Sequence, residues 1–140
     1  MSNTDNGAVV RRWIEEHVSK GNQKVVEEVI AADCLWHNNP PAMRHGRDGA
    51  IQQVAGFRAA FPDLRVTLAD TIVDRDKVVT HWTIQGTNAG PLMGIPATGK
   101  HATWTSIHIN RVTDGQIAED WHASDLLGVL RQLGIDPIKR

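Results

Sequence analysis

The sequence predicts an α+β fold in which helices cover one face of a bent antiparallel sheet. Apolar residues recur three or four positions apart in the first 60 residues, which is the spacing of amphipathic helices. After Pro62 this pattern gives way to short runs rich in β-branched and aromatic residues, separated by turn residues. The 140 residues suffice for one domain with its own core. We therefore expect a single domain, residues 1–140, whose curved sheet encloses a conical cavity.

Three helices are expected in the first half of the chain. The first covers residues 6–20, where Asn6 can cap the start and the apolar residues share one face. Asn22 can cap a second, short helix. The third covers residues 48–60 and ends at the FPD sequence, whose proline cannot continue a helix. A short strand, DCLWH, precedes this third helix and stops at NNPP.

Four longer strands are expected in the second half, as two hairpins. The first hairpin joins LRVTLADTIV to KVVTHWTIQGT through DRD, and the second joins HATWTSIHINRV to QIAEDWHA through TDG. Between the hairpins lies NAGPLMGIPATGK, whose glycines and prolines predict an irregular loop at the rim of the cavity. The final run, SDLLGVLRQLG, has the pattern of a short amphipathic helix.

Composition excludes several classes of protein. Lys and Arg number 15 against 16 Asp and Glu, and neither sign forms a block, so a nucleic-acid partner is not expected. No run of apolar residues is long enough to span a membrane, and the polar start lacks a signal pattern, so we expect a cytoplasmic protein without a membrane partner. The single cysteine, Cys34, cannot form an internal disulfide and is expected to be a small buried hydrophobe.

The second hairpin is expected to bring ionisable side chains to one face of the sheet. If Gly115 takes the left-handed position of the turn, Val112 pairs near Gln116, Ser106 lies opposite His122, and His108 lies opposite Asp120. Side chains alternate between the two faces of a strand. One face then carries Trp104, Ser106, His108, Asp120 and His122, and the other carries Thr105, Ile107, Ile109 and Trp121.

Two other interpretations of the polar face stay open at this point. It could be the solvated side of the sheet, with the apolar residues of the opposite face packed beneath the helices. The two imidazoles and Asp120 could also bind a metal, although no HxH or HExxH spacing supports one. The large rings of Trp82 and Trp104 and the presence of titratable pairs favour a ligand cavity. We therefore expect a small aromatic ligand and no metal.

Three segments carry a resemblance to a known family: FRAAFPDLRV, the long central GTNAGPLMGIPATGKHATWTSIHINRVTDGQIAEDW, and DLLGVLRQLG. They resemble the SnoaL-like polyketide cyclases, which belong to the nuclear transport factor two-like superfamily. The similarity runs from about residue 13 to residue 134. It implies a cone of three helices and a curved sheet, a deep pocket without a cofactor, and a homo-oligomer, either a dimer or a tetramer.

The resemblance also implies a reaction and the residues that perform it. Cyclases of this family close a ring by intramolecular aldol condensation, with an aspartate after the hairpin tryptophan as acid and base, and a histidine on the neighbouring strand. His108 matches that histidine, whereas the aspartate position after Trp121 holds His122. We therefore expect His122 to transfer the proton with His108 as its partner, and Asp120 or Asp125 to fix the tautomer of His122.

The expected function is that of an enzyme that moves a proton next to the carbonyl group of an aromatic polyketide or a related small molecule. Ring hydroxylation by a relative without the cyclase aspartate, and non-catalytic binding of a small apolar molecule, are the alternatives. His108 or Asn38 is expected to hydrogen-bond the oxyanion. The residues expected to contact the substrate are Trp36, His37, Asn38, Trp82, Trp104 and Ser106.

Overall fold

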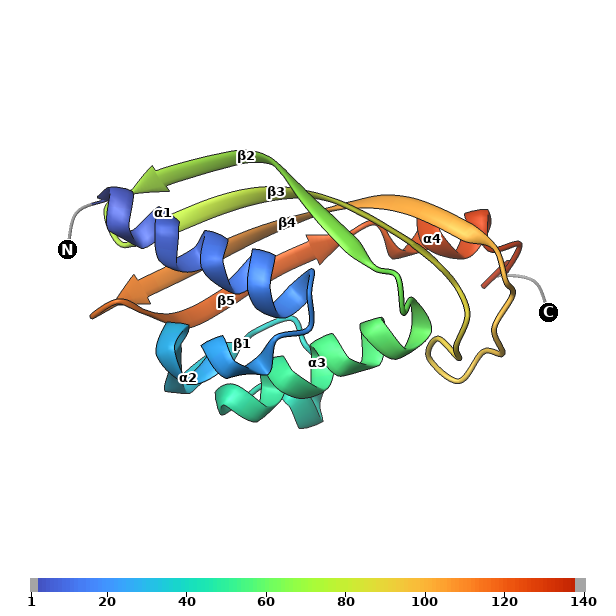
Figure 1. Ribbon diagram of the computed structural model, residues 1–140, viewed down its shortest axis with the longest axis horizontal. Helices are drawn as coiled ribbons and strands as arrows, with labels where there is room; N and C mark the ends of the chain where they lie inside the picture. Colours follow the sequence, from blue (N-terminus) through green and yellow to red (C-terminus); the bar gives the residue numbers. More distant parts are fainter. Residues whose placement is uncertain (1–2, 138–140) are drawn as a thin grey trace.

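The computed structural model describes residues 3–137 of the chain. Its central element is a curved sheet of five strands (Figure 1). The strand order is β1-β5-β4-β3-β2. The pairs β2–β3, β3–β4 and β4–β5 are antiparallel, whereas β1 pairs with β5 in parallel. The bounds of the strands are β1 Ile30–Trp36, β2 Arg65–Asp74, β3 Lys77–Thr87, β4 His101–Thr113 and β5 Gln116–Ser124.

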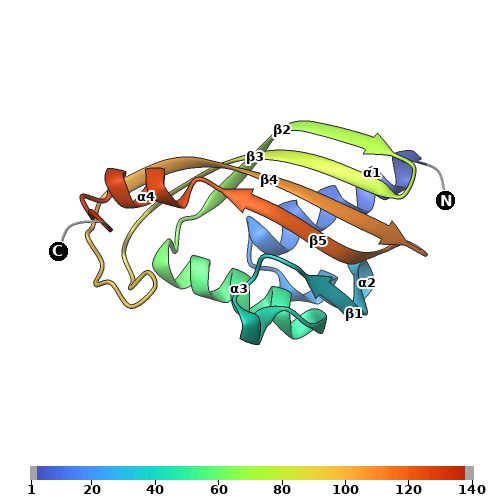
Figure 2. The ribbon, with the colours of Figure 1, turned by 180° about the vertical axis from the view of Figure 1, so that it is seen from behind.

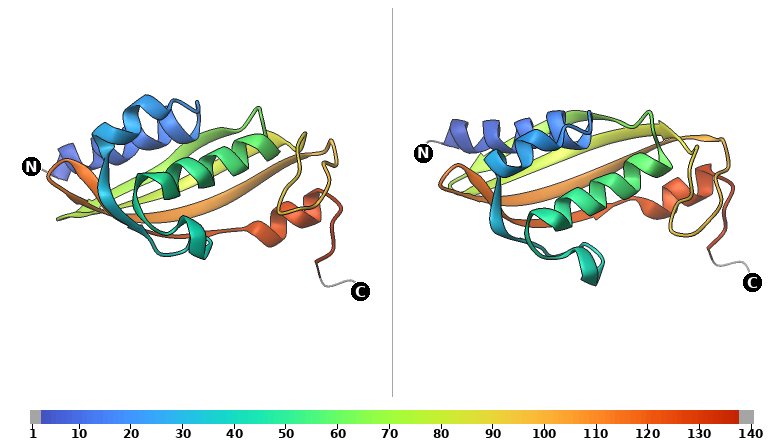
Figure 3. Two further views of the ribbon diagram at one scale, coloured as in Figure 1. Left: turned by 90° about the horizontal axis from the view of Figure 1, so that it is seen from below. Right: turned by 60° about the horizontal axis from the view of Figure 1, so that its bottom comes forward.

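Helices α1, α2 and α3 lie over the same, concave face of this sheet (Figure 3). The view from behind shows strands β2 to β5 on the outer side, without a helix across them (Figure 2). The short helix α4 packs against β4 at the far end of the sheet. The bounds of the α-helices are α1 Asn3–Arg12, α2 Val26–Val29, α3 Gly46–Ala60 and α4 Leu126–Gln132. The predicted α+β cone with covering helices is confirmed.

The first helix differs from its prediction at both ends. Helix α1 already includes Asn3, and it continues as a π-helical turn over Trp13–Val18. Asn6 is therefore not a cap. It lies inside the helix, is buried, and donates a hydrogen bond from Nδ2 to the carbonyl oxygen of Arg75 at 3.1 Å. Because this contact joins the helix to the β2–β3 turn, a polar residue that resembles a cap in the sequence has a tertiary role instead.

The hairpin of β4 and β5 has the predicted faces but a different register. Asp114 and Gly115 form a two-residue turn with φ of 52° and 75°, as a type I′ turn requires. One extra residue on β5 then shifts the register, because Arg111 pairs with Glu119 whereas Val112 pairs with Ile117. The turn and the bulge each displace the pairing by one residue. The two displacements together preserve the alternation, so the predicted inner face is correct although its pairs are not.

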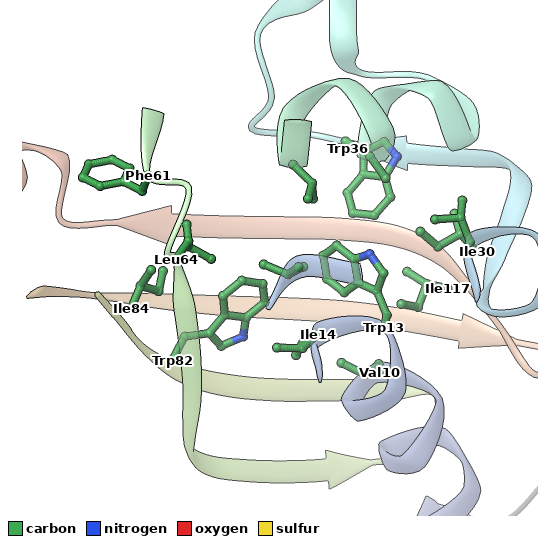
Figure 4. Close-up of a cluster of buried hydrophobic side chains, with 14 of the residues drawn as sticks. Val10, Trp13, Ile14, Ile30, Trp36, Phe61, Leu64, Trp82, Ile84 and Ile117 are labelled. Atoms are coloured by element: carbon green, nitrogen blue, oxygen red, sulfur yellow. The ribbon is translucent and has the colours of Figure 1, made fainter. Parts of the chain in front are cut away.

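Tryptophan rings pack between the helices and the concave face. Figure 4 shows Trp13 from the first helix beside Trp36 and Trp82. The ring centroid of Trp13 lies 5.3 Å from that of Trp36 and 5.8 Å from that of Trp82. On the outer face, by contrast, Ile107 is 50% exposed. The interpretation that the outer face packs beneath the helices is therefore wrong, and the polar set of the hairpin faces inward.

Two smaller predictions concern burial and membranes. Cys34 is fully buried, as expected of a small hydrophobe, and burial raises the pKa of its thiol. Within residues 3–137, no helix combines the length and the apolar character that a membrane crossing requires.

Candidate active site

A cavity lies between helix α3 and the concave face of the sheet. Four tryptophan rings line it together with apolar residues of α3, and its polar lining comes mainly from β4 and β5. A cavity of flat aromatic walls with a few polar groups on one side suits a flat, largely apolar ligand. The tryptophans are Trp13, Trp36, Trp82 and Trp104.

On the cavity side of β4 and β5, polar residues form three consecutive cross-strand pairs, which we call the polar ladder. The pairs are Asn110 with Asp120, His108 with His122, and Ser106 with Ser124. Members of each strand are two residues apart, so all six side chains point to the same face. The ladder is the structural consequence of the hairpin register, and it places a carboxylate next to two imidazoles.

Asp120 is the centre of this ladder. Its carboxylate accepts three hydrogen bonds of 2.8 Å: Oδ2 from His108 Nδ1 and from Asn110 Nδ2, and Oδ1 from His122 Nδ1. Its side chain is 0% exposed. Burial alone would raise the pKa of Asp120, but the attraction of His108 and the hydrogen bonds from both histidines outweigh it and lower that pKa. Asp120 is therefore an ionised, fully buried acceptor.

His108 is held between two aromatic rings. Its ring stacks on the indole of Trp82 at 3.9 Å and on the imidazole of His122 at 4.7 Å, measured between centroids. The indole is itself fixed, because Trp82 Nε1 donates to Thr80 Oγ1 at 2.8 Å. Burial lowers the pKa of His108 although the neighbouring Asp120 acts in the opposite direction. A neutral His108 with its Nδ1–H on Asp120 presents the lone pair of Nε2.

His122 has the same anchor and a more exposed side chain. Its Nδ1 donates to Asp120, and its side chain is 15% exposed against 9% for His108. Its backbone N–H donates to Asn38 Oδ1 at 2.9 Å, which fixes the strand at this position. Within residues 3–137, Nε2 of neither imidazole has a hydrogen-bonding protein partner. The arrangement therefore offers two imidazole bases whose tautomers are set by one carboxylate.

The same three residues are the one group of potential metal ligands in the part of the chain that the structure describes. One ligand atom from each of His108, Asp120 and His122 lies within 4.8 Å of the others. The two rings are only 20° from parallel, however, and their Nδ1 atoms meet different oxygens of the carboxylate. A metal ion bound by Asp120 and both Nδ1 atoms would have to replace the two Nδ1 protons and turn the rings toward one point. The geometry favours the hydrogen-bonded triad, and the absence of a metal stays a prediction.

The structure distributes the predicted substrate residues over both sides of the sheet. The rings of Trp36, Trp82 and Trp104 and the hydroxyl of Ser106 line the cavity. His37 does not line it, because its ring stacks on Trp121 at 4.7 Å on the outer side. Asn38 accepts the backbone N–H of His122 and does not line the cavity either. The predicted contact of His37 and Asn38 with substrate therefore has no support in the geometry.

Asp125 has a local role at the start of helix α4. Its Oδ1 accepts the backbone N–H of Gly128 at 2.9 Å, which makes it the helix cap. It is exposed and does not line the cavity. Of the two carboxylates that the sequence offered as the partner of His122, the structure selects Asp120.

Several residues that line or support the cavity were absent from the prediction. Trp13 belongs to the apolar stripe of its helix, so the sequence pattern identifies it only as core. Asn110 continues the alternation of β4 by one position and Ser124 that of β5, a signal that could have identified them. Gln53 and Arg58 reach the cavity from α3, where nothing in the helical pattern separates them from solvent-facing residues.

Comparison with known proteins relates the sequence to one family. The family model described as SnoaL-like polyketide cyclase matches residues 8–133. The chain is 29% identical over 134 residues to aklanonic acid methyl ester cyclase DnrD of Streptomyces peucetius, covering 90% of this chain and 88% of that protein. It is 32% identical over 122 residues to nogalonic acid methyl ester cyclase of Streptomyces nogalater, covering 84% and 88%.

A solved structure has the same architecture. TsrD from Streptomyces laurentii superposes with a TM-score of 0.87 at 28% sequence identity, covering 96% of this chain and 98% of that one. The arrangement of sheet and helices in this chain is therefore shared with a related protein of solved structure.

Proposed function

We propose proton transfer next to a carbonyl group as the function of this chain, which belongs to the SnoaL-like polyketide cyclase family. One observation carries the proposal: Asp120 accepts Nδ1–H from two imidazoles at 2.8 Å inside a cavity lined by tryptophan. Removal of a proton from carbon requires a base with a free lone pair, and a neutral imidazole oriented by a carboxylate is such a base.

The substrate class that we propose is a flat, anthraquinone-type methyl ester. Relatives in the family are named as cyclases of aklanonic acid methyl ester and nogalonic acid methyl ester. The walls of the cavity agree with this class, because flat indole faces favour contact with fused aromatic rings.

The proposed reaction starts at Nε2 of His122. This atom takes the proton from the carbon next to the ester carbonyl, and the resulting imidazolium is stabilised by ionised Asp120. The enolate carbon then attacks a ketone carbon of the same molecule, which forms the new carbon–carbon bond. The alkoxide produced there takes the proton back from His122. The cycle is balanced in protons and electrons, and it needs no cofactor.

The same geometry offers an interpretation of the departure from the family pattern. The resemblance places an aspartate at position 122, where this chain has histidine. Asp120 lies two residues earlier on the same face of β5, and its Oδ1 lies 2.8 Å from His122 Nδ1. We propose that the carboxylate and the imidazole act as a pair, in which His122 meets the substrate and Asp120 stabilises the charge.

The proposal is tested by replacing His122. We expect His122→Ala to lower turnover of such esters about a hundredfold or more, with ligand affinity nearly unchanged, because a general base is removed. His122→Asp should retain or raise activity, since it restores the residue that the family resemblance implies. Quenching of tryptophan fluorescence measures binding separately from turnover. His37→Ala is the matched control, because that imidazole lies on the outer side.

The outcomes separate the three functions that the sequence allows. Loss of turnover with intact binding in His122→Ala supports proton transfer. Equal turnover in His122→Ala and the parent protein on a confirmed substrate contradicts it. Binding without any ring closure, across both esters and hydroxyarenes, indicates a non-catalytic binder, whereas oxygen uptake with a hydroxyarene indicates ring hydroxylation.

A further inference from the structure

Next to the imidazoles, the polar ladder ends in two serine hydroxyls. Ser106 and Ser124 face each other across β4 and β5, two residues along each strand from His108 and His122. Two residues of an antiparallel strand span about 7 Å. Both serines line the cavity, Ser106 buried and Ser124 toward the exposed end of β5. One small ligand can therefore contact an imidazole and this hydroxyl pair together.

The hydroxyl pair can donate a hydrogen bond into the cavity. The two Oγ atoms lie 2.8 Å apart, and Ser106 Oγ also lies 3.3 Å from the carbonyl oxygen of Ala123. Each hydroxyl has one proton to donate. When Ser106 donates to Ala123, Ser124 can donate to Ser106. When Ser106 turns and donates to Ser124, the proton of Ser124 becomes available to a ligand oxygen. The only hydrogen bond lost is the longer one, from Ser106 to Ala123.

The imidazoles do not supply this donor while they act as bases. Their Nδ1–H groups are bound to Asp120, so each neutral ring offers a lone pair, and not a proton, at Nε2. Asn38, the other residue expected to bind the oxyanion, uses its Oδ1 to accept the backbone N–H of His122. A negative charge that develops on a substrate oxygen inside an apolar cavity needs a donor in place.

We propose that Ser124, with Ser106 donating to it, provides the hydrogen bond that stabilises the enolate oxygen when an imidazole removes the neighbouring proton. The inference rests on the proposed proton-transfer function and adds to it the residue that meets the oxygen. The hydroxyl proton stays on Ser124. Its hydrogen bond strengthens as negative charge builds on the acceptor, and the donation from Ser106 polarises it further.

Steady-state kinetics with anthraquinone-type methyl esters test this role. We expect Ser124→Ala to lower kcat roughly ten- to a hundredfold with KM within about twofold, because the bond matters in the transition state more than in the bound substrate. Ser106→Ala should produce a smaller loss, since it removes only the polarising donor. Thr105→Ala is the matched control: it removes a hydroxyl from the same strand on the outer, exposed face and should leave kcat unchanged. Parental kcat in Ser124→Ala, together with an inactive His122→Ala, would overturn the serine role and leave proton transfer in place.

A second measurement needs no turnover and so separates this inference from the proposed function. The probe is 2-naphthol, whose absorbance distinguishes the phenol from the phenolate, titrated with pH at saturating protein. A donor at Ser124 favours the bound anion, so the pKa of bound naphthol should be about one unit lower in the parent protein than in Ser124→Ala, a tenfold preference. Equal pKa values of bound naphthol in the two proteins overturn the serine role, even if no ester is turned over.

Discussion

Two neighbouring carboxylates on β5, Glu119 and Asp120, lie within hydrogen-bonding distance of histidines on opposite faces of one sheet. Glu119 Oε2 lies 2.7 Å from His37 Nε2, and Asp120 Oδ2 lies 2.8 Å from His108 Nδ1. The distances are nearly identical. The environments differ, because the side chains of the outer pair are 32% and 24% exposed, against 9% and 0% for the inner pair.

The outer pair belongs to a solvated network. Glu119 Oε1 also accepts from Arg111 Nε at 2.7 Å, and the ring of His37 stacks on Trp121. Hydrogen bonds from His37 and then from Arg111 lower the pKa of Glu119. Water competes for all of these contacts, so the network is of little energetic consequence.

The inner pair differs in what its carboxylate can do. Asp120 is removed from water, and every hydrogen bond it accepts comes from a fixed protein donor. A proton gained by a neighbouring imidazole is then stabilised by a charge that solvent does not screen. The comparison teaches that burial of the carboxylate and the further hydrogen bonds it accepts distinguish a candidate catalytic histidine–carboxylate pair. The distance between the two groups does not distinguish it.

The largest expected effect comes from removing each carboxylate charge in turn. Asp120→Asn should lower turnover by roughly a hundredfold or more, because a neutral amide cannot stabilise an imidazolium. The NH₂ group of the new side chain must also face a group that now donates a hydrogen bond to Asp120. Glu119→Gln should change turnover less than about twofold. Both are measured as kcat/KM with the folded fraction checked by circular dichroism. Similar losses in the two folded variants would show that burial does not distinguish the pairs.

His17 sharpens the comparison because it is a buried imidazole that pairs with an indole instead of a carboxylate. It accepts a hydrogen bond from Trp13 Nε1 at 3.1 Å and is 1% exposed. Burial, with a smaller contribution from Arg58, lowers the pKa of His17 to about 4. In the unfolded chain His17 binds a proton below its ordinary pKa of about 6.5, whereas in the folded chain it stays neutral. The free energy of unfolding therefore decreases as the pH falls toward 4.

At pH 5 this difference corresponds to about 2 kcal/mol of lost stability relative to pH 7. Urea denaturation at both pH values measures it. His17→Gln should lose about that much less stability between pH 7 and pH 5 than the parent protein. An unchanged pH dependence in His17→Gln would contradict the role of burial.

A smaller effect is expected from substitutions on the outer face, which should weaken self-association. Ile72, Val79, Ile109 and Trp121 pair side by side across β2 to β5 and form an apolar row on the face without helices. Ile72 is 61% exposed. We propose that a second copy of the chain covers this row, since an exposed apolar patch of this kind marks an interaction site. Ile109→Lys should weaken the dimer about tenfold or more in sedimentation equilibrium. A parent protein that is monomeric at micromolar concentration would contradict this interface.

The sequence predicted the elements and the two faces of the hairpin because both depend on local periodicity. Residues are still assigned to the correct face when the predicted pairing is wrong by an even number of residues. Here the turn and the bulge each displaced the pairing by one residue, so the total error was two. The individual pairs depended on the turn and on a bulge, neither of which periodicity specifies. His108 therefore faces His122, where the prediction had placed Asp120 opposite it.

Long-range contacts account for what the sequence could not reveal. The parallel pairing of β1 with β5 joins residues more than 80 positions apart, and it turns His37 to the outer side while the neighbouring Trp36 lines the cavity. Asp120 and Asp125 lie two and three residues from His122 in sequence, so proximity along the chain does not decide between them. Only the start of helix α4 decides that Asp125 is a cap, so the choice of carboxylate required the structure.

The central claim is that an inner-face imidazole anchored on Asp120 removes a proton from carbon. The most direct measurement follows exchange of the proton next to the ester carbonyl with solvent in D₂O, by NMR, before any ring closure. The account predicts rapid exchange with the parent protein and with His37→Ala, and a rate at least about a hundredfold lower with His122→Ala. Exchange by folded His122→Ala at the parental rate would contradict it.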